Sequence, residues 1–232
     1  MNFDRRIEEV REEYLLRMTR GNEALLRQVE DYVTARFGKM LRPRLLLAAA
    51  ATLGDEAFDS RRTLLLATCV EMLHNASLLH DDVVDEASER RGRDSVNHHW
   101  NNQIAVLVGD YHLAQISLLL AEVGDSTATA RINDTVLAMV ESELLAQEVA
   151  LGLHPLDSES YLRIIDGKTA RLFATACALG NPAYEEYGLH YGRLFQLRDD
   201  IDDGDDNAFT QALIRQEEDI IHTLQPLNIH NL

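Results

Sequence analysis

The sequence is poor in the residues that interrupt helices, with four prolines and twelve glycines in 232 positions. Long stretches therefore carry no break signal. Cysteine is also scarce: Cys69 and Cys177 stand far apart, each in apolar surroundings with helical periodicity. This spacing excludes a thiolate zinc site or a disulfide framework and predicts two buried, reduced thiols in a cytoplasmic protein.

Positive charge is in short supply as well. The chain has 22 Lys and Arg against 39 Asp and Glu, a formal net charge of −17. A general nucleic-acid binder needs a basic face to neutralise phosphates, so this balance argues against one. Any phosphate ligand must be met by a local group of basic residues.

The sequence also lacks targeting and spanning segments. Residues 1–9 are charged and have no apolar core of the secretory type. No run approaches the roughly 20 apolar residues that a membrane-spanning helix requires. We therefore expect a cytoplasmic protein without a membrane span.

Apolar residues recur at the helical spacing of i, i+3, i+4 and i+7 along most of the chain, and no segment alternates as a strand does. With 46% hydrophobic residues and no Gly/Ser-rich or Pro-rich linker, the sequence predicts one all-α domain, a bundle of long helices over residues 1–232. The predicted helices are 3–19, 22–37, 43–53, 60–86, 101–123, 127–151, 158–179, 183–203 and 208–224.

Two aspartate clusters, at 81–85 and 199–203, end apolar helical runs. Each has carboxylates at i, i+1 and i+4, and positions i and i+4 lie on one helix face. Because like charges so placed repel, cations between them are the best explanation, and hard oxygen ligands suit Mg²⁺. The alternative is a solvated acidic surface. The equal spacing of the two clusters favours metal binding and two helix ends at one cavity.

The only two lysines lie in distinctive motifs. Lys39 follows Gly38 and precedes Arg42-Pro43, whereas Lys168 stands in Gly167-Lys168-Thr169. An ammonium beside a hydroxyl is a suitable phosphate donor. The alternative is an arginine-biased composition with two stray lysines. Arg90-Arg91-Gly92 follows Asp85 by about one and a half helical turns and can reach the same cavity mouth.

Taken together, these motifs resemble the trans-isoprenyl (polyprenyl) diphosphate synthase family from about residue 36 to residue 204. The motifs are Gly38-Lys39-Met40-Leu41-Arg42-Pro43, His74, Asp81 to Asp85, Arg90-Arg91-Gly92, Gly109-Asp110-Tyr111, Lys168-Thr169-Ala170 and Gln196-Leu197-Arg198 followed by Asp199 to Asp203. The resemblance implies a bundle of long helices around a deep central cavity, the isoprenoid synthase type of fold.

The resemblance also implies roles for individual residues. Three Mg²⁺ would grip the diphosphate of an allylic substrate through Asp81, Asp82, Asp85, Asp199 and Asp203. Direct donors to that diphosphate would be Arg90, Lys168 and Thr169, with Gln196 lining the same end. The diphosphate of isopentenyl diphosphate would be held by Lys39, Arg42, His74 and Arg91. The residues carrying the reaction itself would be Asp81, Asp82, Asp85, Lys168 and Asp199.

The implied chemistry is prenyl transfer. Metal ions stabilise the departing pyrophosphate, and the isopentenyl double bond attacks the allylic cation. Bulky residues one turn below the first aspartate cluster would stop a growing chain, but Ala76 and Ser77 stand there. Small residues leave the passage open, so we expect a trans-polyprenyl product of about C20 or longer.

Three alternatives remain. Glu71-Met72-Leu73-His74 also fits the Glu-x-x-His pattern of di-iron bundles, but such sites need it twice. A terpene cyclase would have no use for a second diphosphate site. After Asp203 there is no lysine, and the only arginine is Arg215, so the domain looks shortened beyond the second cluster. This feature favours a non-catalytic or regulatory subunit of a heteromeric synthase as the main alternative to an active homodimer.

Overall fold

The computed structural model describes residues 1–21, 23–35, 37–204 and 207–227. Asn22 and Arg36, both in the predicted helix 22–37, lie outside the described residues, as do 205–206 and 228–232. The described chain is helical, with a single isolated bridge between Glu89 and Asp94. The prediction of an all-α protein is confirmed.

The chain divides into two compact units. The N-terminal unit comprises Asn2–Arg44 and Asp59–Asp125, and the C-terminal unit comprises Met1, Leu45–Phe58 and Ser126–Leu232. The partition into one domain stays a prediction.

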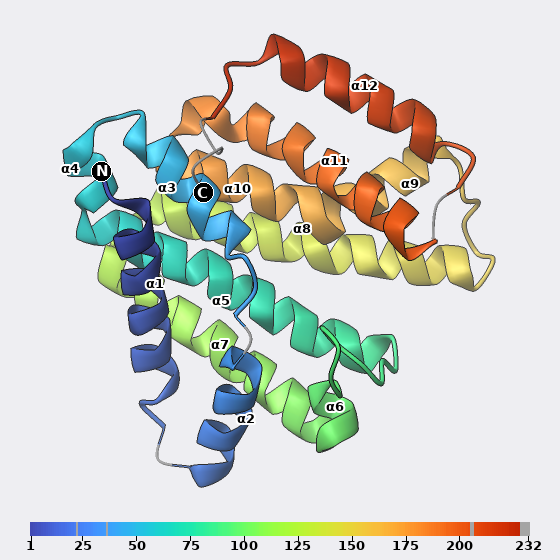
Figure 1. Cartoon of the computed structure of the whole chain (residues 1–232). Coiled ribbons are helices and arrows are strands. Elements are labelled where there is room, and N and C mark those ends of the chain that lie inside the picture. Colours follow the sequence, from blue (N-terminus) through green and yellow to red (C-terminus); the bar gives the residue numbers. More distant parts are fainter. Residues whose placement is uncertain (22, 36, 205–206, 228–232) are drawn as a thin grey trace. The chain divides into compact units, whose positions relative to one another are not determined.

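In the N-terminal unit, a long central helix packs along a second long helix and against the first helix of the chain (Figure 1). The helices of this unit are α1 (Phe3–Met18), α2 (Ala24–Thr34), α5 (Arg61–Val84), α6 (Val96–His99) and α7 (Asn102–Val123). Two unit boundaries fall inside helices, one in α3 (Leu41–Ala51) and one in α4 (Asp55–Asp59), and most residues of both helices belong to the C-terminal unit.

Helix α5 is the core helix of the N-terminal unit. The Ser60 hydroxyl caps its first turn by accepting the Thr63 N–H, and the residues from Thr63 to Leu73 are buried on every side. This burial follows from apolar character that wraps around the helix. The helix ends at Asp85, so the first aspartate cluster lies at the end of a buried helix, as predicted.

In the C-terminal unit, α11 packs against both α10 and α12 (Figure 1). The elements of this unit are α8 (Ser126–Ala150), α9 (Ser158–Ile165), a π-helical turn (Asp166–Ala170), α10 (Arg171–Gly180), a 3₁₀ turn (Pro182–Tyr184), α11 (Glu185–Asp203) and α12 (Thr210–Thr223). The second aspartate cluster forms the last turn of α11, and Gly204 closes that helix in the left-handed conformation (φ 78°).

The predicted helix 158–179 is interrupted in the structure. The π turn, named here for residues Asp166–Ala170, separates α9 from α10. Gly167 makes this turn possible, since a Cβ at that position would lie 2.4 Å from the Ala138 carbonyl oxygen of α8. A π turn inside a helical run is rare and is frequently found at functional sites.

Helix α7 is a long apolar helix of the N-terminal unit. By length and composition it is apolar enough to cross a membrane, although 44% of its most apolar window is buried inside the protein. A buried core helix meets the same criterion, so this is weak evidence for a span. Within its unit, α7 packs along α5.

Candidate functional site

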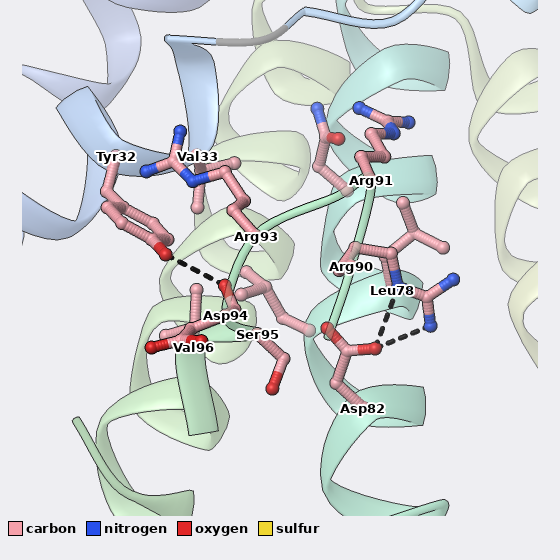
Figure 2. A pocket seen from close by; sticks show the side chains of 12 residues that line it. Tyr32, Val33, Leu78, Asp82, Arg90, Arg91, Arg93, Asp94, Ser95 and Val96 are labelled. Carbon is pink, nitrogen blue, oxygen red and sulfur yellow. Dashed lines mark hydrogen bonds and ion pairs between the residues drawn. The ribbon is translucent and has the colours of Figure 1, made fainter. Parts of the chain in front are cut away.

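The first aspartate motif occupies the last turn of α5. The Asp85 N–H donates to the Asp81 carbonyl oxygen at 2.8 Å, which keeps both residues in helical register. Asp82 is 3% exposed, and its Oδ1 accepts hydrogen bonds from both Nε (2.8 Å) and Nη2 of Arg90 (Figure 2). Burial raises the pKa of Asp82, while Arg90 opposes this rise. The predicted neighbourhood of Asp82 and Arg90 is therefore present as a direct ion pair.

The loop after α5 holds its arginines by backbone geometry. Arg91 lies in the left-handed region (φ 54°), and the Arg90 N–H donates to the Arg93 carbonyl oxygen at 2.7 Å. Asn97 Nδ2 donates to the carbonyl oxygens of Asp82 and Ala87, at 3.0 Å each. These hydrogen bonds hold the loop against the end of α5, so the backbone of Arg90 and Arg91 is fixed in place.

A buried basic group adjoins this loop. Glu71 is 2% exposed and Arg42 is half-buried. Burial lowers the pKa of Arg42 to about 10 and raises that of Glu71, while their mutual attraction opposes both changes. Burial, then Arg42 and Arg91, lower the pKa of His74 far below its usual range. His74 is therefore a neutral imidazole at physiological pH, able to donate one N–H.

The Gly38-Lys39 segment reaches the same arginines. A Cβ at Gly38 would lie 3.1 Å from Arg91 Nη2, so the backbone approaches that guanidinium closely. Lys39 is exposed, and its carbonyl oxygen accepts from Arg44 Nε at 3.0 Å. Of the four residues predicted to hold one diphosphate, the structure brings Arg42, His74 and Arg91 within electrostatic range of one another. The fourth, Lys39, follows Gly38 in the same unit.

A small cavity of about 60 Å³ opens beside the loop. Arg93 covers one of its walls, with its guanidinium carbon 3.3 Å from the ring centroid of Tyr32, and the Tyr32 hydroxyl donates to the Asp94 carbonyl oxygen at 2.8 Å (Figure 2). Sequence reasoning missed Tyr32 and Arg93, because nothing in their spacing links α2 to a loop about 60 residues later.

The second aspartate motif is supported differently. Asp200 Oδ1 accepts from Gln196 Nε2 at 2.6 Å, and Asp200 Oδ2 accepts from the Tyr161 hydroxyl. Thr169 donates to Gln196 Oε1 at 2.5 Å, so the π turn is tied to α11. Asp199 and its i+4 neighbour Asp203 are exposed.

The charges of this motif repel, as its spacing predicts. The pKa of Asp199 is raised, first by burial and then by the charges of Asp203, Asp200 and Asp202. Lys168 is exposed on the π turn between Gly167 and Thr169, and no ion pair joins its ammonium to a described residue. Its charge is available to an anion.

The donor chemistry of both motifs suits magnesium, since carboxylate oxygens are its preferred protein ligands. Among the described residues, however, no three acidic, His or Cys side chains converge on one metal position. In the first motif, Asp82 binds Arg90 instead. The magnesium roles of Asp81, Asp82, Asp85, Asp199 and Asp203 therefore stay predictions.

The two residues predicted to set product length lie differently. Ala76 is 1% exposed and packs inside the core, so in this structure it does not border an open passage. Ser77 is half-buried, and its hydroxyl donates to the His74 carbonyl oxygen at 2.9 Å. Of the two, Ser77 is the better placed to meet a ligand.

Comparison with known proteins identifies the class to which this arrangement belongs. Residues 23–211 match the model of the polyprenyl synthetase family. The match covers most of the chain, and the chain belongs to this family. The all-α isoprenoid synthase fold is shared with its solved members.

Individual relatives carry more detailed names. The chain is 38% identical over 198 residues to an all-trans-nonaprenyl-diphosphate synthase (geranyl-diphosphate specific) of Rhodobacter capsulatus, covering 81% of this chain and 59% of that protein. It is 36% identical to the octaprenyl diphosphate synthase of Haemophilus influenzae, covering 86% and 62%. A polyprenyl synthase structure from Caulobacter crescentus, complexed with calcium and isoprenyl diphosphate, matches with a TM-score of 0.79 at 33% identity, covering 85% and 62%. The chain thus spans about three fifths of the length of these relatives.

Proposed function

We propose that the protein is a magnesium-dependent prenyltransferase, which condenses isopentenyl diphosphate with an allylic diphosphate to give a longer trans-polyprenyl diphosphate. The observation that carries the proposal is the pairing of two features on α5. The aspartate motif ends this helix, and two turns earlier His74 lies among the basic residues Arg42 and Arg91. A one-substrate cyclase has no use for this second, basic site.

The residues can divide the work as follows. Arg42, Arg91 and the neutral His74 donate to the isopentenyl diphosphate and fix its double bond for attack. Lys168, with Arg90, donates to the allylic diphosphate as its C–O bond ionises. Thr169 donates as well once its single hydroxyl proton turns from Gln196 Oε1 to the phosphate. When bound, Mg²⁺ held by the aspartates supplies positive charge to the leaving pyrophosphate. Loss of a proton then leaves a chain five carbons longer, and the released pyrophosphate can accept that proton.

The relatives support the finer parts of the proposal. One solved neighbour is complexed with calcium and isoprenyl diphosphate, which fits a divalent cation and a prenyl substrate here. Nonaprenyl and octaprenyl names among the relatives favour a product longer than C20. The proposal includes a cytoplasmic location and a homodimer, and sedimentation velocity tests the latter.

The direct test is incubation of the folded protein with isopentenyl diphosphate, an allylic diphosphate and Mg²⁺, with the products separated against chain-length standards. We expect products of C20 or longer, and none when EDTA replaces the metal. Absence of any elongated product from a folded, metal-loaded protein would refute the proposal.

A second candidate is a subunit that binds diphosphate but turns over only with a partner. The observation favouring it is the Asp82–Arg90 pair, because this pair occupies a predicted metal ligand and a predicted substrate donor at once. Activity that is absent alone and restored by a second synthase subunit would favour this candidate over the first.

A further inference from the structure

Three polar side chains on one face of α11 contact one residue of α9 and two residues of the π turn, and we call these three contacts the α11 ladder. Arg193, Gln196 and Asp200 follow one another at i, i+3 and i+7, which places them on one helix face. Their partners, in the same order, are Asp166, Thr169 and Tyr161. The π turn is therefore tied to α11 at both of its ends, on either side of Lys168.

The strongest contact of the α11 ladder is the ion pair of Arg193 and Asp166. Arg193 Nε lies 2.5 Å from Asp166 Oδ1 and Nη2 lies 2.7 Å from Oδ2, a bidentate geometry. The side chains are 18% and 30% exposed, so the pair is partly shielded from water. Such fork-shaped pairs fix orientation as well as distance, which a lysine at position 193 would not do.

Helix α12 holds the arginine from behind. Glu217 is fully buried at 0% exposure, with Oε1 3.3 Å from Arg193 Nη1 and Oε2 bonded to His190 Nδ1. A buried carboxylate is costly unless it is paired, so Glu217 requires both partners. The link from α12 to the π turn thus runs through Arg193.

We propose that Arg193 and Asp166 are positioning residues that lock the π turn in the register presenting Lys168 and Thr169 to a diphosphate, with Glu217 of α12 holding Arg193 in place. In this proposal both act through the π turn, and the groups that bind the diphosphate are those of Lys168 and Thr169. This inference rests on the proposed function for the identity of the ligand, but the rigidity of the turn can be measured without it.

The scarcity of lysine gives a specific probe. The only side-chain amines of the protein are Lys39 and Lys168, both exposed, so amine-selective labelling read by peptide mass spectrometry reports each separately. In the unmodified protein we expect inorganic pyrophosphate with Mg²⁺ to protect Lys168. The labelling rate of Lys39 without ligand is the internal reference, since Lys39 belongs to the other unit.

Asp166→Asn is the gentler test, because it leaves the Arg193–Glu217 contact in place. We expect it to raise the pyrophosphate concentration that half-protects Lys168 by on the order of tenfold, the usual effect of removing a residue that orients a ligand-binding group. Arg193→Gln should give at least as large a rise, because it also removes the contact with Glu217. The double variant should give no more than Arg193→Gln alone, because the contact between Arg193 and Asp166 is already lost in that single variant.

Arg131→Gln is the matched control. It breaks another single ion pair of the same unit, between α8 and Glu185 of α11 (2.5 Å), away from the π turn. We expect it to leave the half-protecting concentration unchanged. An equal rise in this control would assign the effect to general loosening and would overturn the proposal.

Hydrogen exchange separates this inference from the proposed function. Asp166→Asn should speed exchange of the amides of the π turn about tenfold, whether or not a diphosphate binds. If pyrophosphate fails to protect Lys168 in the unmodified protein, a diphosphate site at Lys168 is refuted while faster exchange still supports the lock. If both variants match the unmodified protein in exchange and in protection, the lock does not exist.

Discussion

Glu30 is a buried acid without a counter-charge, and replacing it should make the protein more stable at alkaline pH. It lies on α2 with 2% exposure, and neither carboxylate oxygen has a hydrogen-bond partner among the described residues. His112 Nδ1 is 3.7 Å from Glu30 Oε1 but lies 2.8 Å from the Val108 carbonyl oxygen. Burial lowers the pKa of His112 to about 4, so it offers no positive charge.

The size of the effect follows from proton linkage. Burial, with a smaller contribution from Asp31, raises the pKa of Glu30 from 4.5 to about 8. Between these values the unfolded chain has lost the proton and the folded chain keeps it, so the stability falls as pH rises through this window. A shift of about 3.5 pH units corresponds to roughly 5 kcal/mol at the upper end, a large part of a typical total of about 5–15 kcal/mol.

Glu30→Gln removes the ionisable carboxyl group but keeps nearly the same shape as the neutral acid. In urea unfolding we expect the variant to be more stable than the unmodified protein by only about 1 kcal/mol at pH 5, and by about 4 kcal/mol at pH 8. Glu12→Gln, at an exposed position of the same unit, is the control and should show no such divergence. The reasoning would be refuted if the difference in stability between Glu30→Gln and the unmodified protein were the same at pH 5 and at pH 8.

Three further predictions concern the site and its support. Asp81→Ala and Asp199→Ala should each nearly abolish turnover while circular dichroism shows an intact helical fold; unfolding would indicate a structural role instead. Ser77→Phe should shorten the product in chain-length chromatography, whereas Ala76→Phe should mainly lower stability, by about 1–3 kcal/mol, because that site is already packed. Gly167→Ala should also lower the free energy of unfolding in urea by about 1–3 kcal/mol, because the added Cβ would lie 2.4 Å from the Ala138 carbonyl oxygen. Unchanged stability would mean that α8 can shift away from the added Cβ at little cost.

Much of the fold is predictable because the composition and the apolar periodicity of the sequence indicate the helices. The predicted helix 60–86 corresponds to α5 (Arg61–Val84), whose buried faces follow from apolar residues all round. The π turn is not predictable in this way, since one extra residue in a turn barely alters the periodicity of a run of some 20 residues. The short helices α4 and α6, of five and four residues, are below the length at which periodicity can be read.

The site is predictable to a different degree. The lysine motif singles out Thr169, and the family resemblance singles out Gln196. Neither predicts that Thr169 donates to Gln196 Oε1 at 2.5 Å. Tyr161 and Arg193 are missed altogether, although both contact singled-out segments. Their roles depend on which helix faces meet after folding, and a tyrosine or arginine in an amphipathic helix has no local mark that distinguishes it from an ordinary surface residue.

The two aspartate motifs share a division of labour that their spacing alone does not reveal. In each, the second aspartate is engaged by its own unit: Asp82 by Arg90, and Asp200 by Gln196 and Tyr161. The motifs end in the exposed carboxylates Asp85 and Asp203, each four residues after the first aspartate and so on its face of the helix. Burial raises the pKa of Asp199, and the neighbouring charges of Asp203, Asp200 and Asp202 raise it further; a bound cation would relieve this repulsion between the carboxylates. The middle acid thus anchors the helix end, while Asp85, Asp199 and Asp203 remain exposed at the ends of the two motifs.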